Sequence, residues 1–148
     1  MIFLIHFIIK ISKIKFYKAA IKAAANNNEI EIIYFLLSNE EKISDILFYG
    51  IEELTAIAIP YSVESIEYSS FRECKSLARI IIPSSVKSIG QSAFNGCSSL
   101  IEINIPSSVK SIGDCAFFYC ESLRITIPSS FKANTKSFIN YTKSITYY

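Results

Sequence analysis

The chain has 148 residues, 51% of them hydrophobic, and a formal net charge of +2 from 15 basic and 13 acidic residues. This length suits one domain that can bury a substantial core. The charge is nearly balanced and the basic residues stand singly, so the sequence gives no electrostatic basis for binding nucleic acid or an anionic membrane. We therefore expect a single domain without a nucleic-acid partner.

The first nine residues, 1–9, are apolar, which raises the question of export. A secretory signal peptide carries positive charge before its apolar segment and small residues at a cleavage site after it. Here the lysines follow the apolar segment, beginning at Lys10, and no small-residue site precedes the next element. The segment is also too short to cross a bilayer. We expect an additional buried helix or strand, or the irregular start of a truncated gene product, and no membrane span.

Residues 15–38 have helical periodicity, several strong helix formers and no proline. Within them, 24–37 resembles the middle of an ankyrin repeat: a helix ending in two alanines, a polar turn at Asn27 and Asn28, and a second helix ending in two leucines. The ankyrin start motif Thr-Pro-Leu-His is absent, and the alternative is a plain amphipathic helical hairpin. Both interpretations predict a helical N-terminal cap over residues 1–42, with the helix pair at about 15–38, that covers one end of the following repeats.

After this segment a sequence motif, Ile-Pro-Ser-Ser-Val-Lys-Ser-Ile, recurs with small changes. Pro60, Pro83 and Pro106 follow one another at a constant step, and Pro128 follows at a step that is one position shorter. A fixed period of about 23 residues is typical of a solenoid, in which identical positions stack from coil to coil into apolar columns. The columns are Phe48, Phe71, Phe94 and Phe117; Ile51, Cys74, Cys97 and Cys120; Leu54, Leu77, Leu100 and Leu123; Ile43, Ile66, Ile89 and Ile112; Ile57, Ile80, Ile103 and Ile125; Ile59, Ile82, Ile105 and Ile127.

One coil is predicted to contain a short strand. Residues after Leu100 alternate apolar and polar, which places Ile103 inward and Glu102 and Asn104 outward. Pro106 has no N–H to continue a parallel ladder, so the strand ends before it.

The rest of the coil is predicted to bend and return. Gly113, like Gly90 one coil earlier, is expected to free the backbone for a bend. Residues 114–120 place Phe117 and Cys120 at helical spacing, which predicts a single short helical turn on the outer face.

The pattern Leu-x-x-Ile-x-Ile-Pro-x-x-Val-x-x-Ile-Gly-x-x-Ala-Phe-x-x-Cys-x-x-Leu, read from residue 100 to 123, resembles the BspA-like class of leucine-rich repeats. The resemblance covers 43–126 well and the tail weakly. It predicts an α/β repeat fold: a leucine-rich-repeat solenoid of short parallel strands in coils of about 22–23 residues over 43–148, with a degenerate last coil. The resemblance implies protein binding and surface adhesion as functions.

The cysteines are expected to be structural. Cys74, Cys97 and Cys120 share a column that accepts Ile51, so their thiols are interpreted as small buried hydrophobic groups. Cys115 lies in a column that holds serine in other coils, and we expect it to face outward as a free thiol. The absence of Cys-x-x-Cys spacing argues against a metal site, and unpaired thiols favour a reducing compartment.

No residue pair in the sequence suggests catalysis. The single histidine, His6, stands in the apolar leader, and the pairs Glu40–Glu41 and Glu52–Glu53 are expected to be solvated. Four glycines in the whole chain form no phosphate-binding loop. We therefore predict no enzyme activity, no catalytic residue, no cofactor and no metal.

The outward strand positions are the candidate protein-binding surface. Stacked strands would bring them together in a patch of mixed charge and some apolar area, suited to a protein partner whose identity the sequence does not give. The alternative is that they form ordinary solvated sheet. The candidates are Arg79, Ile81, Glu102, Asn104, Arg124 and Thr126, continued in the first coil by Ala56 and Ala58.

Two classes of function fit these features. The first is a non-catalytic cytoplasmic scaffold for protein–protein interaction, favoured by the ankyrin-like segment and the free thiols. The second is a cell-surface or secreted adhesin, favoured by the leucine-rich class and the apolar leader. The tripeptide Asn140-Tyr141-Thr142 is a glycosylation sequon that matters only if the chain is exported.

The last coil is predicted to end on a strand. Counting the shorter repeat step onward from Leu123 reaches Ile145, while Asn134 and Thr142 replace the isoleucine and the cysteine of the pattern. A strand with one unpaired edge is a template for pairing with another chain. We therefore expect either a natural product that continues past Tyr148 or end-to-end self-association.

Overall fold

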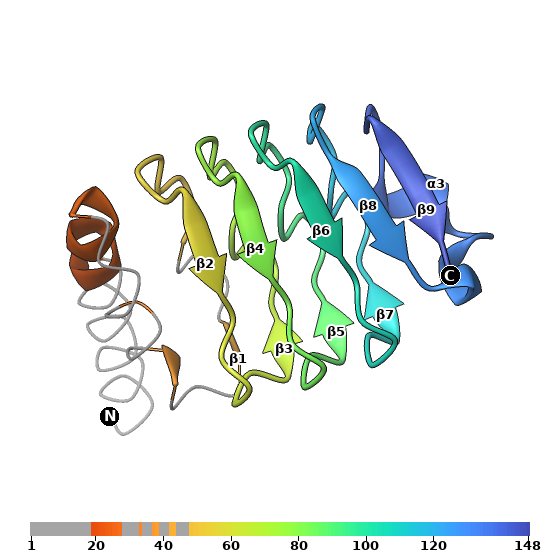
Figure 1. Cartoon of the computed structure of the whole chain (residues 1–148), viewed down its shortest axis with the longest axis horizontal. Helices are drawn as coiled ribbons and strands as arrows, with labels where there is room; N and C mark the ends of the chain where they lie inside the picture. Colours follow the sequence, from red (N-terminus) through yellow and green to blue (C-terminus); the bar gives the residue numbers. More distant parts are fainter. Residues whose placement is uncertain (1–18, 28–32, 34–36, 39–41, 44–47) are drawn as a thin grey trace, which may run out of the picture.

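The computed structural model of the chain describes residues 19–27, 33, 37–38, 42–43 and 48–148. They form a solenoid in which successive coils add strands to two parallel sheets, and the last coil adds a strand, β9, to only one of them (Figure 1). The first sheet has the order β1-β3-β5-β7 and the second the order β2-β4-β6-β8-β9. The strands are β1 (Lys42–Ile43), β2 (Ala56–Ala58), β3 (Ser65–Ile66), β4 (Arg79–Ile81), β5 (Ser88–Ile89), β6 (Glu102–Asn104), β7 (Ser111–Ile112), β8 (Arg124–Ile127) and β9 (Ser144–Tyr147).

The strand register confirms the predicted coil length and parallel pairing. Arg79 lies beside Glu102, one full repeat step later, and Glu102 lies beside Arg124, at the step that is one position shorter. Ser65 and Ser88 are paired in the first sheet at the full step. The predicted solenoid of short parallel strands is therefore confirmed.

The predicted columns form the core. The phenylalanine column stacks nearly parallel from Phe48 to Phe117, with ring centroids 4.6, 5.2 and 5.3 Å apart and interplanar angles of 15°, 6° and 6°. Over residues 48–148, the leucine, cysteine and inward strand isoleucine columns are buried from coil to coil. Ile112 is an exception because it is only partly buried. Stacked apolar columns make the core continuous, so no coil buries its apolar face alone.

The outer segment of each coil is a series of turns, and the predicted helical turn is wrong. The N–H groups of Ala93, Asn95 and Cys97 bond to carbonyls three residues earlier. Ser92 has φ 55° and Gly96 has φ 79°, values that a right-handed helix cannot contain. The N–H of Phe94 donates to the carbonyl of Ala116 in the next coil at 2.8 Å. Because the N–H of Phe94 bonds to the neighbouring coil, it is not available to a hydrogen bond within a helix.

Gly90 and Gly113 serve close approach and not a bend, which corrects a second expectation. Neither has a positive φ, whereas Gly50 and Gly96 do. A Cβ on Gly113 would lie 2.3 Å from the backbone N of Gln91, and one on Gly90 would lie 2.6 Å from the carbonyl carbon of Glu67. Only glycine lets neighbouring coils approach this closely at these positions.

The last coil is shorter than predicted. It contains the 3-10 helix η1 (Ser129–Phe131) and the helix α3 (Thr135–Phe138) before β9. Ile145 lies beside Ile125, and not at the position of Leu123 that counting by the repeat step gave. The final strand exists as predicted, but its register differs because helical turns replace part of the repeat.

The described part of the N-terminal segment includes helical residues 19–26. Ile21, Ala24, Ile33 and Leu37 are buried in the same core cluster as the repeats. Much of the predicted second helix lies outside the described residues, as do residues 1–18 with His6, so the division at residue 42 remains a prediction. Among the described residues no helix is both long enough and apolar enough to cross a membrane.

Candidate binding surface on the five-stranded sheet

The outward strand positions lie in two rows across the five-stranded sheet. The strands alternate in burial, with Ile80 and Ile103 inside and their neighbours exposed. The charged row joins Ala56, Arg79, Glu102 and Arg124, which lie side by side through the strand register. The second row pairs Ala58 with Ile81 and Asn104 with Thr126. The parallel ladder therefore brings the six predicted residues onto one face.

The charged row alternates in sign and is not internally paired. Within the described part of the chain, Arg79, Glu102 and Arg124 form no ion pair, although elsewhere Lys87 and Glu64 lie 2.9 Å apart. These side chains are exposed, so their charges are available to a partner.

An open hollow of about 560 Å³ lies on this face, and five of the six predicted residues line it. Thr126 does not line it and is half-buried at the edge of the patch. We call this feature the sheet-face hollow. Its lining residues are Thr55, Ala56, Ala78, Arg79, Ile80, Ile81, Ile82, Ile101, Glu102, Asn104 and Arg124.

Ile101 is the main residue that the sequence reasoning missed. Its side chain is 47% exposed, and with Ile81, which is 60% exposed, it supplies the apolar part of the hollow. Ile101 continues the positions of Thr55 and Ala78, each directly after a core leucine. The next coil lacks a residue between Leu123 and Arg124, so it has no position equivalent to Ile101. The missing residue in the next coil was the feature of the sequence that could have predicted the exposure of Ile101.

The lining has the chemistry of a surface that recognises another surface. It combines two exposed isoleucines with two guanidinium groups, one carboxylate and one amide. Apolar side chains framed by polar groups are typical of protein interfaces.

Cys74, Cys97 and Cys120 are buried in the core, as the sequence predicted. Burial raises the pKa of the Cys97 thiol well above its usual value and that of Cys120 to about 12. Both thiols are therefore neutral near pH 7 and poor metal ligands, since a thiolate is the binding form. Cys115 has no disulfide partner and is half-buried, with φ 58°. No group of three metal-ligating side chains occurs among the residues that the structure describes.

The fold and this face define a leucine-rich-repeat solenoid, and comparison with known families agrees. The model of the BspA type leucine rich repeat region matches residues 10–146 in six copies. The chain belongs to this family. A comparison with curated proteins found no match.

Solved structures similar to the chain include three leucine-rich-repeat proteins. A leucine rich cell surface protein from Faecalibacterium prausnitzii is 34% identical with a TM-score of 0.65, covering 72% of this chain and 29% of that one. A leucine-rich repeat protein from Bacteroides ovatus is 25% identical with a TM-score of 0.52, covering 69% and 32%. One from Bacteroides capillosus, at 23% identity and a TM-score of 0.52, covers 72% and 62% and supports the fold alone. The chain therefore spans less than two thirds of the length of each of these proteins.

The comparisons do not support the ankyrin-like interpretation of residues 24–37. The leucine-rich-repeat match begins at residue 10 and runs through this segment. The N-terminal residues are therefore better described as part of the repeat family than as a separate repeat type.

Proposed function

We propose that the chain is a non-catalytic scaffold that binds a protein partner through the sheet-face hollow. One observation carries the proposal: the exposed isoleucines Ile81 and Ile101 are framed by Arg79, Glu102 and Arg124, which form no ion pair with any other described residue. Burying the isoleucines would contribute affinity, and the alternating charges would select the partner and its orientation. Repeat solenoids commonly use such extended faces for binding.

A charge-reversal series tests this proposal. The partner is first captured by photo-crosslinking from position 81 and purified, and its affinity is then measured against variants of the chain. Arg79→Glu and Glu102→Arg should each weaken binding about tenfold, as loss of a well-placed charge at an interface does. The matched reversals Lys87→Glu and Lys110→Glu, at exposed lysines that directly precede β5 and β7, should change the affinity less than twofold. The opposite ranking would place the binding site on another face.

The location of the chain is proposed to be the cell surface or the exterior, which replaces the cytoplasmic expectation. The comparisons give the cytoplasmic prediction no support, whereas one similar structure is that of a leucine rich cell surface protein. The cysteines no longer favour a reducing compartment, because Cys74, Cys97 and Cys120 are buried. In a host that glycosylates exported proteins, the exported chain should migrate more slowly in electrophoresis than the Asn140→Gln variant, which lacks the glycosylation site. Recovery of the chain only from the cytosol would contradict it.

End-to-end association is proposed as a second contact. Away from β8, strand β9 pairs with no strand of the described chain. An unpaired edge can pair with a second copy.

A further inference from the structure

The four-stranded sheet ends one coil earlier than the five-stranded sheet. Strand β7 is its last member, whereas β8 is followed by β9 (Figure 1). The coil after β7 places Phe131 in η1 and Asn134 at the start of α3, so it provides no strand there. Ile112 in β7 is only partly buried as a result, although Ile89 at the same position of β5 is buried.

The edge of β7 presents two carbonyl groups that inner strands use for pairing. In each inner coil, the carbonyls at two positions accept N–H groups from the following coil, over 2.7–2.8 Å. The bonds run from Lys87 to Glu64, from Gly90 to Ile66, from Lys110 to Lys87 and from Gly113 to Ile89. The equivalent carbonyls at the edge of β7 belong to Lys110, which directly precedes the strand, and to Ile112. No described residue donates to either. Both acceptors are available to an added strand.

An open groove of about 450 Å³ lies beside this edge. Its apolar part consists of Ile112, Phe131 and Phe138, and its cations are Lys110 and Lys136. Polar side chains and one alanine complete the lining: Ser111, Asn134, Ser137 and Ala133. We call this feature the β7 groove.

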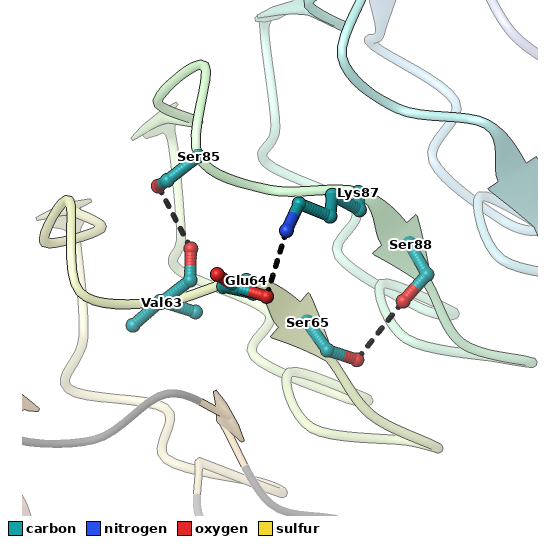
Figure 2. Close-up of polar contacts among 6 residues, drawn as sticks. All are labelled: Val63, Glu64, Ser65, Ser85, Lys87 and Ser88. Atoms are coloured by element: carbon teal, nitrogen blue, oxygen red, sulfur yellow. Dashed lines mark hydrogen bonds and ion pairs between the residues drawn. The ribbon is translucent and has the colours of Figure 1, made fainter.

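Within the described residues, no carboxylate pairs with the two lysines of the groove. Between β3 and β5, Lys87 pairs with Glu64 at 2.9 Å and the hydroxyl of Ser88 donates to that of Ser65 at 3.0 Å (Figure 2). One coil later the ammonium of Lys110 donates only to the carbonyl of Ser107, 2.8 Å away, and meets no carboxylate among the described residues. Lys136 likewise has no acidic partner in that part of the chain. A strand next to β7 would satisfy these lysines if it carried carboxylates.

We propose that the β7 groove binds an extended acidic peptide segment of a partner protein by strand addition. The peptide lies alongside β7 and donates backbone N–H groups to the carbonyls of Lys110 and Ile112. Its inward side chain covers Ile112, and its carboxylates lie against Lys110 and Lys136. Backbone pairing supplies affinity in this mode, and the side chains select the sequence. This site is separate from the sheet-face hollow.

Two hexapeptides with sequences from the chain itself test the proposal by fluorescence anisotropy. The probe is fluorescein-labelled Ser-Val-Glu-Ser-Ile-Glu, the sequence of residues 62–67, which places a glutamate against a neighbouring lysine in the fold. The control is Ser-Val-Lys-Ser-Ile-Gly, the sequence of residues 85–90. With the complete 148-residue chain, the acidic peptide should bind saturably and the control at least about tenfold more weakly, because its charge is reversed.

Variants of the chain and of the peptide locate the contact. Lys110→Ala and Lys136→Ala should each weaken the acidic peptide about threefold, and the double variant about tenfold, as expected for exposed ion pairs. Lys87→Ala and Arg79→Glu should leave its affinity unchanged, and the second separates this site from the sheet-face hollow. Two versions of the acidic probe are methylated on one or the other set of alternate backbone nitrogens. Only one of these sets can donate to the carbonyls beside β7, so one version should lose binding and the other should keep it.

Four results would overturn the proposal. They are an absence of saturable binding by the acidic probe, equal binding of the lysine control, full affinity of both N-methylated versions, and equal effects of Lys87→Ala and Lys110→Ala. The first and third exclude strand addition, the second excludes selection for acidic peptides, and the fourth excludes the location beside β7.

Discussion

The thiol of Cys97 donates a hydrogen bond to the carbonyl oxygen of Phe71, 3.1 Å away in the preceding coil. Cys120 bonds to Phe94 at 3.1 Å and Cys74 to Phe48 at 3.0 Å. The column therefore combines apolar packing with a repeated bond from one coil to the previous one. This explains why cysteine recurs at a position that the first coil fills with Ile51.

Stability is expected to fall in strongly alkaline solution because of this column. Burial raises the pKa of Cys120 to about 12, above the ordinary value of 9.0 that applies to an unfolded thiol. The raised value means that the folded state keeps a proton which the unfolded state loses. The stabilisation is therefore complete below about pH 9 and is lost as the pH rises towards 12. Within that window each pH unit costs up to about 1.4 kcal/mol per thiol.

Urea melts at several pH values check this prediction. Cys120→Val, which lacks the titrating group, should lose less free energy of unfolding between pH 9 and 11 than the parent chain. The Cys115→Val change serves as the control, since that side chain is half-buried. Equal alkaline losses in the parent and in Cys120→Val would contradict the assignment.

The core columns predict which substitutions destabilise. Leu100 and Ile103 are 0% and 1% exposed, so replacing either with alanine should cost about 2–5 kcal/mol of unfolding free energy. Lys87→Ala and Lys110→Ala remove exposed side chains and should stay within about 0.5 kcal/mol. Chemical denaturation measures both groups. If the lysine variants lost as much stability as the core variants, the register of the columns would be wrong.

Gly113 and Gly50 are expected to resist alanine for different reasons. At Gly113 a Cβ would lie 2.3 Å from the backbone N of Gln91, so Gly113→Ala forces the coils apart and should cost about 1–3 kcal/mol or more. Gly50 has open space around it but φ 66°, so Gly50→Ala should cost only the strain of that conformation, about 1 kcal/mol. The melting temperature of Gly113→Ala should therefore be lower than that of Gly50→Ala in thermal unfolding. The reverse order would show that the coils adapt easily.

The sequence predicted the columns and the strand register because stacking requires the same residue types at a fixed step. It also placed Arg79, Glu102 and Arg124 on one face, since side chains alternate along a strand. It did not predict the outer turns, because the N–H of Phe94 bonds to a carbonyl in another coil and local spacing cannot show that. The exposure of Ile101 depends on one residue missing from the next coil, a change in stacking and not in local pattern.

The last coil departed from prediction for a related reason. Counting by the repeat step assumed another regular coil, whereas η1 and α3 shorten the path, so that Ile145 lies beside Ile125. Packing of Phe131 against Phe138, whose ring centroids are 5.9 Å apart at 88°, holds this alternative coil together. The departures from the repeat at Asn134 and Thr142 predicted that the last coil is irregular, but they did not predict the helical turns that replace it.

Self-association is predicted through the edge of β9. Its outer edge has no partner strand among the described residues, and Tyr147 and Ile145 are only half-buried. Light scattering coupled to size-exclusion chromatography should show the mass of the 148-residue chain rising from monomer towards dimer as its concentration increases. Thr146→Lys places a charge on an exposed position of this edge strand and should keep the chain monomeric, because lysine on an edge opposes pairing. Ser130→Lys adds the same charge at an exposed position in η1 and should leave the association unchanged. A chain that stays monomeric at every concentration, or one that Thr146→Lys and Ser130→Lys affect equally, would exclude pairing through β9.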